Sequence, residues 1–342
     1  MQPYTTQSPP QFLRPIWLPD REIAQLLPHE DAYMAVRDCL LCHERGEFVQ
    51  PLKPYVRPRG REGEYEGGRF IAMPAYLGGR FDMAGIKWIA GFPTNLNRGL
   101  PRASGTLQLN CSVTGRPLAI MECETLSARR TTAIAVLAVD LLAAPPPLKV
   151  AIIGAGPIGC TVLEALTSRA RSTLADIRLC DTQLGRAEAA AEAITHCGLP
   201  SVGCYRSAAE AVRGANVVIC ATTGASGYLR EDWLDPGWLV IALSLDDATP
   251  ELFLSADRII VDDFEQCCRE EKLLHRLVQA GRLNRDRISA ELGQVVAGVK
   301  PGRLHPSENI YLNPMGMAIE DIAVGVTAYR RSITLGIGQT LS

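Results

Sequence analysis

The sequence of 342 residues has no long uninterrupted apolar run, and this absence argues against a membrane protein. Its most apolar stretch, Ala133 to Leu148, is interrupted by Asp140 and three prolines, whereas a membrane-spanning helix needs about 20 consecutive apolar residues. The first residues show no basic segment followed by an apolar one, so we expect no signal peptide. The eleven cysteines are then expected to be free thiols in a cytoplasmic protein.

The sequence also lacks an excess of charge of either sign. It has 35 Lys and Arg against 37 Asp and Glu, a formal net charge of −2, which argues against a protein that binds nucleic acid. Its five histidines show no spacing typical of metal ligands, so no metal site is expected. With 47% hydrophobic residues, the chain has the composition of a globular protein and is long enough for two domains.

From Leu148 onward, apolar strands alternate with amphipathic helices, a pattern typical of a parallel, doubly wound sheet. The predicted strands are Leu148–Ile153, Asp176–Cys180, Asn216–Ala221, Leu239–Leu243 and Arg258–Val261. The predicted helices between them include Ile158–Ala170, Arg186–Cys197 and Ala208–Val212. The proline run Pro145–Pro147 precedes this region and ends a long apolar helix predicted for Glu124–Ala143, because proline clashes with a continuing helix.

The N-terminal part has a different pattern. Two helices, Arg21–Leu27 and His29–Gly46, are followed by short extended runs separated by Gly, Asn and Pro, which indicate a mostly antiparallel sheet. These runs are Arg69–Leu77, Met83–Ala90, Thr106–Val113 and Pro117–Met121. A last helix, Asn313–Tyr329, is expected to return to this part. We therefore predict an α/β protein with a Rossmann domain at 131–309 and a discontinuous α+β domain at 1–130 and 310–342.

The first strand of the Rossmann region is followed by Gly154-Ala155-Gly156-Pro157-Ile158-Gly159, a G-x-G-x-x-G motif that opens a helix. This context is the one that the motif needs. Gly154 permits a tight turn, Gly156 allows the backbone to approach a pyrophosphate, and Gly159 allows close packing of helix on strand. The helix N-terminus then faces the phosphate charge. The sequence therefore predicts a dinucleotide site.

Side chains at the ends of the neighbouring strands indicate which dinucleotide binds. Asp181 follows the second strand, where a carboxylate accepts hydrogen bonds from the adenosine ribose and repels a 2′-phosphate. NAD is therefore favoured over NADP, although the nearby Arg186 could soften that preference. Thr222 and Thr223 follow a later strand and are expected to line the same cleft, because ligands bind at the carboxyl ends of such strands.

Cations within apolar segments of the first domain indicate an anionic substrate. Lys87 lies inside an apolar strand, Lys53 follows an apolar turn, and Arg129 and Arg130 lie early in an apolar helix. An unpaired buried ammonium is costly, and a guanidinium suits bidentate binding of a carboxylate. In each case a structural ion pair is the alternative. Asp246 and Asp247 follow a strand at its carboxyl end, where a carboxylate could exchange protons with a substrate amine or with water.

Taken together, these segments resemble the ornithine cyclodeaminase/μ-crystallin family from about Trp17 to Tyr329. The segments that carry the resemblance are Phe48-Val-Gln-Pro-Leu-Lys53, Gly85-Ile-Lys-Trp88, Thr125-Leu-Ser-Ala-Arg-Arg-Thr131, Gly154 to Gly159 and Met315-Gly-Met-Ala-Ile-Glu-Asp321. The resemblance implies that Lys53, Lys87 and Arg130 bind the substrate carboxylate, with Lys87 also catalytic. It further implies that Asp247, or alternatively Asp246, is the acid/base, that Met315 contacts the cofactor, and that the protein is a homodimer.

The substrate depends on the branch of the family. Ornithine cyclodeaminases carry a glutamate before Met-Pro that holds the distal amine, and Ile71 stands at that position here. The sequence is more similar to the opine-like dehydrogenases that make 2,3-diaminopropionate for siderophores and peptide antibiotics. This similarity implies NAD-dependent oxidation of N-(2-amino-2-carboxyethyl)-L-glutamate, a tricarboxylate, with Arg57 or Arg80 as further cations. The alternatives are an ornithine cyclodeaminase, an alanine dehydrogenase or ketimine reductase, and a μ-crystallin-like protein that binds without turnover.

Overall fold

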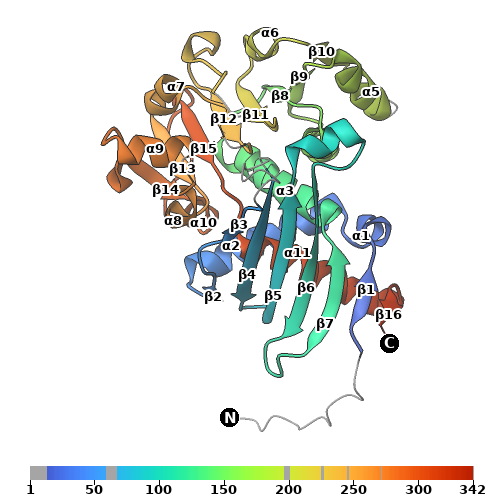
Figure 1. The fold of residues 1–342 in the computed structure, drawn as a ribbon. Coiled ribbons are helices and arrows are strands. Elements are labelled where there is room, and N and C mark those ends of the chain that lie inside the picture. Colours follow the sequence, from blue (N-terminus) through green and yellow to red (C-terminus); the bar gives the residue numbers. More distant parts are fainter. Residues whose placement is uncertain are drawn as a thin grey trace.

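The computed structural model describes residues 14–58, 68–195, 201–224, 227–244, 246–270 and 272–341. These residues fold around two separate sheets of eight strands each, one parallel and one mostly antiparallel (Figure 1). In the view of Figure 1 the parallel sheet lies above the antiparallel one, with helix α3 between them. The predicted fold class, a Rossmann sheet combined with an α+β part, is confirmed.

The parallel sheet has the strand order β10-β9-β8-β11-β12-β15-β13-β14, and all of its pairs are parallel. Its first five strands have the Rossmann order, in which the first strand lies next to the fourth. The strands are β8 Leu148–Ile153, β9 Leu174–Cys180, β10 Val202–Tyr205, β11 Val217–Cys220, β12 Leu239–Ala242, β13 Arg258–Val261, β14 Ile288–Glu291 and β15 Ile310–Asn313.

Helices and helical turns connect these strands. They are α4 Pro157–Arg169, α5 Leu184–Thr195, α6 Ala208–Val212, η2 Glu231–Trp233, α7 Pro250–Ser255, α8 Phe264–Cys267, α9 Leu273–Gln279, η3 Arg285–Arg287 and α10 Leu292–Val296. Helix α5 covers most of the predicted helix 186–197, of which residues 196–197 lie outside the described residues.

The mostly antiparallel sheet has the order β16-β1-β7-β6-β5-β4-β2, and β3 also pairs with β4. Its strands are β1 Ile16–Leu18, β2 Phe48–Val49, β3 Tyr55–Val56, β4 Arg69–Leu77, β5 Met83–Gly91, β6 Ala103–Cys111, β7 Pro117–Glu122 and β16 Gln339–Thr340. The remaining elements are α1 Asp20–Leu26, α2 His29–Glu44, η1 Pro93–Arg98, α3 Glu124–Leu142 and α11 Ala318–Leu335. Helix α11 packs on β4, β5 and β6 and so covers one face of this sheet.

The C-terminal helix begins later than the sequence predicted, and this prediction is corrected. A helix was expected over Asn313–Tyr329, but Ile310–Asn313 form β15 in the parallel sheet and α11 begins at Ala318. The carboxylate of the buried Asp262 accepts hydrogen bonds from the backbone N–H groups of Met315 (2.8 Å) and Gly316 (2.6 Å). Gly316 also has φ +73°, outside the helical region. The segment between β15 and α11 is therefore an ordered turn.

Two elements join the two parts of the chain. Helix α3 packs against α2 and α11 on one side and against α4 and β12 on the other. The C-terminal segment contributes β15 to the parallel sheet and α11 to the antiparallel one. The domain division at 131–309 stays a prediction. Helix α3 runs across its first boundary, and β15 of the parallel sheet lies just beyond its second boundary.

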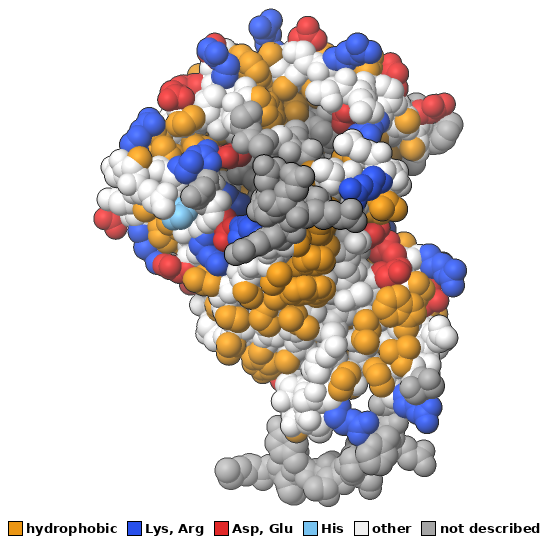
Figure 2. Space-filling view, viewed as in Figure 1, with side chains coloured by type: hydrophobic (Ala, Val, Ile, Leu, Met, Phe, Trp, Pro, Cys, Tyr) orange, Lys and Arg blue, Asp and Glu red, His pale blue; other side chains and the backbone are white. Residues whose placement is uncertain are grey.

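The second face of the antiparallel sheet is apolar over β4 and β5. Met73, Ala75 and Leu77 of β4 point to the α11 side and are buried. Because side chains alternate along a strand, Phe70 and Pro74 of β4 point to the opposite side. Ile86 and Trp88 of β5 share that side, and the rings of Phe70 and Trp88 stack with centroids 5.5 Å apart. Figure 2 shows hydrophobic side chains gathered over this region. No helix in the described residues is both long and apolar enough to cross a membrane.

Candidate active site

The glycine-rich turn between β8 and α4 forms one wall of a cleft of about 500 Å³. Gly154 has φ +108°, and a Cβ there would lie 2.5 Å from the carbonyl oxygen of Ala221. A Cβ on Gly159 would lie 1.8 Å from the oxygen of Gly154, so only glycine allows α4 to pack this closely. A Cβ on Gly156 would meet nothing within 4 Å, because this glycine faces the open cleft. The turn thus leaves space for a ligand at Gly156 alone.

The other walls of the cleft come from the carboxyl ends of the neighbouring strands. Among the residues predicted for cofactor binding, Gly154, Gly156, Pro157, Asp181, Thr222 and Thr223 line it. Asp181 Oδ2 accepts a hydrogen bond from Ala155 N (3.0 Å), and Oδ1 accepts one from Gln183 N (2.8 Å). Ile158 and Met315 instead line another, smaller cavity of about 110 Å³. Arg186 and Arg206 also line the cleft, at the end where Asp181 lies.

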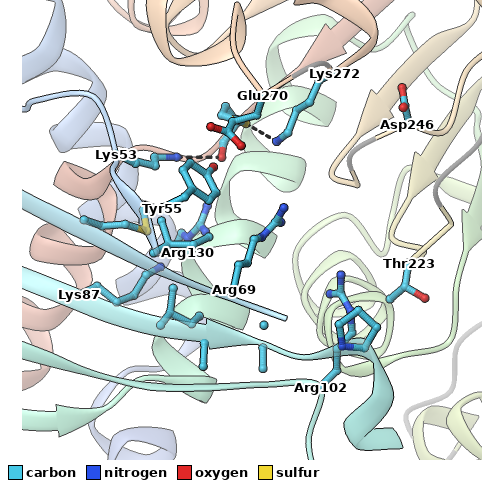
Figure 3. Close-up of a pocket in the computed structure, with 18 of the residues that line it drawn as sticks. Lys53, Tyr55, Arg69, Lys87, Arg102, Arg130, Thr223, Asp246, Glu270 and Lys272 are labelled. Atoms are coloured by element: carbon cyan, nitrogen blue, oxygen red, sulfur yellow. Dashed lines mark hydrogen bonds between the residues drawn. The ribbon is translucent and has the colours of Figure 1, made fainter. Parts of the chain in front are cut away.

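A second cavity, of about 460 Å³, lies between the end of the antiparallel sheet and the parallel sheet (Figure 3). It shares Arg102, Thr223 and Gly224 with the cleft, so the two spaces meet at these residues. Six cationic side chains line it, against the two carboxylates Asp246 and Glu270. The cations are Lys53, Arg69, Lys87, Arg102, Arg130 and Lys272. We call this space the cationic cavity.

The three cations predicted to bind a carboxylate lie together in this cavity. Lys87 Nζ donates to Asp321 Oδ1 (2.7 Å) and to Ser127 Oγ (3.3 Å), which places it between β5, α3 and α11. Arg130 pairs with Glu320 (3.2 Å) and Asp321 (3.3 Å). Lys53 Nζ donates to the backbone oxygens of Met315 and Gly316, in the turn that precedes α11. We call Lys53, Lys87 and Arg130 the inner cluster.

Burial shifts the ionisation of this cluster. Burial lowers the pKa of Lys53 to about 8, and burial also lowers the pKa of Lys87, although Asp321 opposes this. Burial raises the pKa of Glu320 to about 7, with Arg130 opposing. Near neutral pH, Glu320 is therefore only partly ionised, so it offsets the charge of Arg130 incompletely.

The two candidate acid/base residues lie in different places. Asp246 lines the cationic cavity, and its carboxylate is held by two hydrogen bonds from Arg276 (2.8 and 3.0 Å). Asp247 is buried, and its Oδ1 accepts hydrogen bonds from Thr222 Oγ1 (3.0 Å) and Tyr228 Oη (3.1 Å). Both partners line the dinucleotide cleft. Asp247 Oδ2 has no hydrogen-bond partner among the described residues, and burial raises the pKa of Asp247 to about 6.

Three cations of the cavity were not predicted from the sequence, and two cations that were predicted lie outside its lining. Arg69, Arg102 and Lys272 line the cavity, whereas Arg57 pairs with Glu270, and Arg80 pairs with Asp38 (2.7 Å). Arg69 begins β4 whereas Arg80 follows the end of that strand, so they lie at opposite ends of it. The antiparallel pairing of β4, β5 and β6 brings Arg69 and Arg102 to the same end. Strand pairing was the signal that could have found them.

A glycine-rich turn at a helix N-terminus and a cationic cavity that opens beside it define a dinucleotide-binding enzyme of the Rossmann class. The family model described as "Ornithine cyclodeaminase/mu-crystallin family" matches residues 18–334. The chain belongs to the ornithine cyclodeaminase/μ-crystallin family.

Individual relatives narrow the class. The chain is 37% identical over 320 residues to N-((2S)-2-amino-2-carboxyethyl)-L-glutamate dehydrogenase of Staphylococcus aureus, covering 92% of this chain and 94% of the relative. It is similar to the solved dimer of an archaeal alanine dehydrogenase with bound NAD, with a TM-score of 0.86, 27% identity and coverage of 96% and 99%. It is also similar to Δ1-pyrroline-2-carboxylate reductase of Thermococcus litoralis in complex with NADH and L-proline, with a TM-score of 0.86, 26% identity and coverage of 95% and 100%. The predicted family is confirmed, as is the class of an NAD-dependent oxidoreductase.

Proposed function

We propose that the protein catalyses the NAD-dependent oxidative cleavage of N-(2-amino-2-carboxyethyl)-L-glutamate to 2,3-diaminopropionate and 2-oxoglutarate. The observation that carries this proposal is the set of six cationic side chains in a cavity that meets the dinucleotide cleft at Thr223 and Gly224. A substrate with three carboxylates matches that lining in charge. The 37% identity to the S. aureus dehydrogenase for this substrate supports the same choice.

The residues of the cleft fit NAD. The open space over Gly156 and the N-terminus of α4 suit a pyrophosphate, and Asp181 lies where a ribose would be recognised. Thr222, Thr223, Ile158 and Met315 would surround the part of the cofactor that points to the cationic cavity. Bound NAD supplies the hydride acceptor for the reaction.

The inner cluster binds the carboxylate next to the carbon that is oxidised. Lys87 and Arg130 are held rigidly by Asp321 and Glu320, so their N–H groups lie in place before the substrate arrives. Hydride leaves the glutamyl Cα, and the amine nitrogen loses a proton as the C=N bond forms. Water then adds to this imine, and cleavage of the C–N bond gives the 2-oxo acid and the free amine. One NAD is reduced and one water is consumed for each substrate.

We assign the proton transfers to Asp247, with Asp246 as the alternative. A carboxyl group whose pKa is about 6 exchanges protons readily near neutral pH, and Asp247 keeps Oδ2 without a partner among the described residues. Asp246 has the more direct access to the cationic cavity, but Arg276 occupies both of its oxygens. Direct access to the cavity therefore favours Asp246 as the acid/base, whereas a pKa near neutral pH favours Asp247.

The cavity wall argues against two other substrates. Ile71, Met73 and Ile89 form an apolar part of the lining, which offers no partner for the distal ammonium of ornithine. Alanine has a single carboxylate, so it would leave several cations of the cavity without an anion. A binding protein without turnover would keep the pocket but would show no NADH formation.

The proposal also includes a homodimeric assembly, a cytoplasmic location and a role in biosynthesis. An apolar sheet face of the kind shown in Figure 2 supports a homodimer, as in the archaeal alanine dehydrogenase dimer. The described cysteines are free, which suits a cytoplasmic enzyme. Its amine product would serve the synthesis of a siderophore or a peptide natural product.

The test is NADH formation by the purified protein with NAD, measured by absorbance. The substrates are N-(2-amino-2-carboxyethyl)-L-glutamate, L-alanine and L-ornithine, with proline analysed in the ornithine sample. We expect NADH and 2-oxoglutarate in equal amounts from the first compound alone. Proline without net NADH would instead indicate a cyclodeaminase, NADH from alanine an alanine dehydrogenase, and no reaction in any sample a binding protein.

A further inference from the structure

Four of the six cationic side chains in the cavity form no ion pair with a carboxylate among the described residues. Lys53 donates to backbone oxygens and Lys272 to Met315 Sδ, which leaves Arg69 and Arg102. Arg69 lies over the ring of Tyr55, with its guanidinium carbon 5.5 Å from the ring centroid. Arg102 Nε is buried and has no hydrogen-bond partner within the described residues. The cavity's own carboxylates do not compensate them, because Asp246 is held by Arg276 and Glu270 by Arg57. Positive charge at this end of the cavity is therefore unbalanced.

Strand pairing brings the two arginines to the same end of the antiparallel sheet, on the strands that flank Gly91. Arg69 of β4 pairs with Gly91 of β5, which pairs in turn with Ala103 of β6, the residue that follows Arg102. A Cβ on Gly91 would meet nothing within 4 Å, so the space above it is open, and Gly91 itself lines the cavity. Burial and the like charge of Arg69 both lower the pKa of Arg102. An anion above Gly91 would remove this repulsion.

The inner cluster lies on the other side of the cavity. In Figure 3 the Arg69 side chain extends into the middle of the cavity, with Lys87 and Arg130 on one side and Arg102 on the other. Arg102 is also the side chain nearest to Thr223 in that view, and both line the dinucleotide cleft as well. A ligand held by the inner cluster at one end can therefore reach Arg69 with a second anionic group.

We propose that Arg69 and Arg102 form a second carboxylate subsite, separate from the inner cluster, that selects a glutamyl side chain by its γ-carboxylate. This inference rests on the proposed function and names the residues that read the substrate's distal acid. A guanidinium presents paired N–H donors that match a carboxylate, and two guanidinium groups exclude an uncharged side chain by remaining unpaired. The same subsite would hold 2-oxoglutarate after cleavage.

Binding of keto acids tests the subsite without requiring turnover. Protein saturated with NADH is titrated calorimetrically with 2-oxoglutarate and with 2-oxopentanoate, which lacks the γ-carboxylate. We expect 2-oxoglutarate to bind roughly 10- to 100-fold more tightly, as for hydrogen bonds to a charged group. Arg69→Gln and Arg102→Gln should remove most of this preference and leave the affinity for 2-oxopentanoate within about threefold. Arg69→Lys and Arg102→Lys should restore part of it.

The exposed Arg98, at the end of η1, is the matched control, because Arg98→Gln removes the same charge from outside the cavity. It should retain the full preference. Because Arg102 also lines the cleft, the Kd for NADH is measured for each variant. Equal affinity of the unmodified protein for both keto acids would overturn the subsite, and so would an equal loss for both in the arginine variants.

Turnover separates this inference from the proposed function. The rates compared are those for N-(2-amino-2-carboxyethyl)-L-glutamate and for its γ-carboxamide, which is the corresponding glutamine derivative. If Arg69→Gln lowers kcat/KM for the first roughly 10- to 100-fold through KM and leaves the second nearly unchanged, the subsite is supported. If the glutamate compound is turned over, but the ratio of kcat/KM between it and its γ-carboxamide is the same in the variants as in the unmodified protein, the subsite is wrong and the proposed function stands. If the glutamate compound is not turned over, but the protein still prefers 2-oxoglutarate to 2-oxopentanoate and loses this preference in the arginine variants, the proposed substrate is wrong and the subsite stands.

Discussion

At the scale of single residues, two adjacent aspartates differ in almost every physical property. Asp246 lines the cationic cavity and is fixed by Arg276, whereas Asp247 is turned inward to Thr222 and Tyr228. Because burial raises the pKa of Asp247 to about 6, this side chain carries a proton for a substantial fraction of the time just below neutral pH. Thr222 also lines the dinucleotide cleft and so connects Asp247 to the cofactor site.

If Asp247 is the base, kcat/KM of the unmodified protein should fall as the pH drops through about 6, because the carboxylate becomes protonated. Asp247→Asn should lower kcat roughly 10²- to 10⁴-fold. Asp246→Asn should keep the acidic limb of the profile, with only a smaller loss of rate. The measurement is the initial rate of NADH formation from pH 5 to 9. Loss of the acidic limb in Asp246→Asn alone would assign the role to Asp246.

Asp247→Asn should lower activity but raise the stability of the fold. The pKa of Asp247 is raised from 3.8 to about 6 in the folded state, so ionisation of this buried group opposes folding. This cost is fully present above pH 6 and absent below about 3.8. Asp247→Asn should therefore stabilise the fold by about 1–3 kcal/mol at pH 8 and by little at pH 4. Urea unfolding at both pH values measures it, and an equal effect at pH 4 and pH 8 would contradict the buried-charge explanation.

At the scale of elements, Gly156 and Gly159 in the turn between β8 and α4 are required for different physical reasons. Gly159 faces the backbone of Gly154, where a Cβ would lie 1.8 Å from the carbonyl oxygen, so it is needed for packing. Gly156 faces the open cleft, where a Cβ meets nothing within 4 Å, so it is needed only where a ligand approaches. One turn therefore combines a structural and a ligand-facing requirement.

This difference predicts different outcomes for the two alanine variants. Gly156→Ala should unfold within about 1 kcal/mol of the unmodified protein, yet bind NAD at least roughly tenfold more weakly, because the methyl group occupies the space of the pyrophosphate. Gly159→Ala should lose about 2–4 kcal/mol of stability through the backbone clash. Thermal unfolding with and without NAD checks both. Normal NAD affinity in Gly156→Ala would contradict the assigned position of the cofactor.

At the scale of the whole molecule, the antiparallel sheet has one face covered by α11 and a second face that is apolar and partly exposed over β4 and β5. Trp88 lies on that second face with 41% of its surface exposed, stacked on Phe70. Lys87, its neighbour in sequence, points to the other face and lines the cationic cavity. One strand thus contributes to both the proposed dimer interface and the proposed substrate site.

If this face forms the homodimer, Trp88→Glu should shift the protein from dimer to monomer, because two carboxylates would be brought into an apolar interface. Light scattering coupled to size-exclusion chromatography measures the mass against 37.1 kDa for one chain. Val299→Glu is the control, because Val299 is 62% exposed and lies away from the antiparallel sheet. A Trp88→Glu protein that remains dimeric would place the interface elsewhere.

Local patterns in the sequence were sufficient for the Rossmann elements and for the dinucleotide turn. Arg258–Val261 and Leu148–Ile153 were predicted with the bounds that the structure has, because continuous apolar runs between turn residues are a local signal. The steric need for glycine at 159 is local in the same sense, because a Cβ there would meet the backbone of Gly154. Lys53, Lys87 and the Arg129–Arg130 pair stood out as charged residues beside or within apolar segments, and the choice of Arg130 came from the family resemblance.

Long-range pairing decided the rest. The short strand β15 lies between β12 and β13 although it follows both in the sequence, and Asp262 orders the turn after it from more than 50 residues away. Arg69 and Arg102 line the same cavity because β4, β5 and β6 align their ends. Whether Asp246 or Asp247 faces the cavity depends on contacts with Arg276, Thr222 and Tyr228. The sequence by itself determined the fold class and the dinucleotide turn, because these depend on periodicity and on a local motif, and the family followed from the resemblance of five segments. Only the tertiary structure decided which charges share a cavity, because that depends on which distant segments pack together.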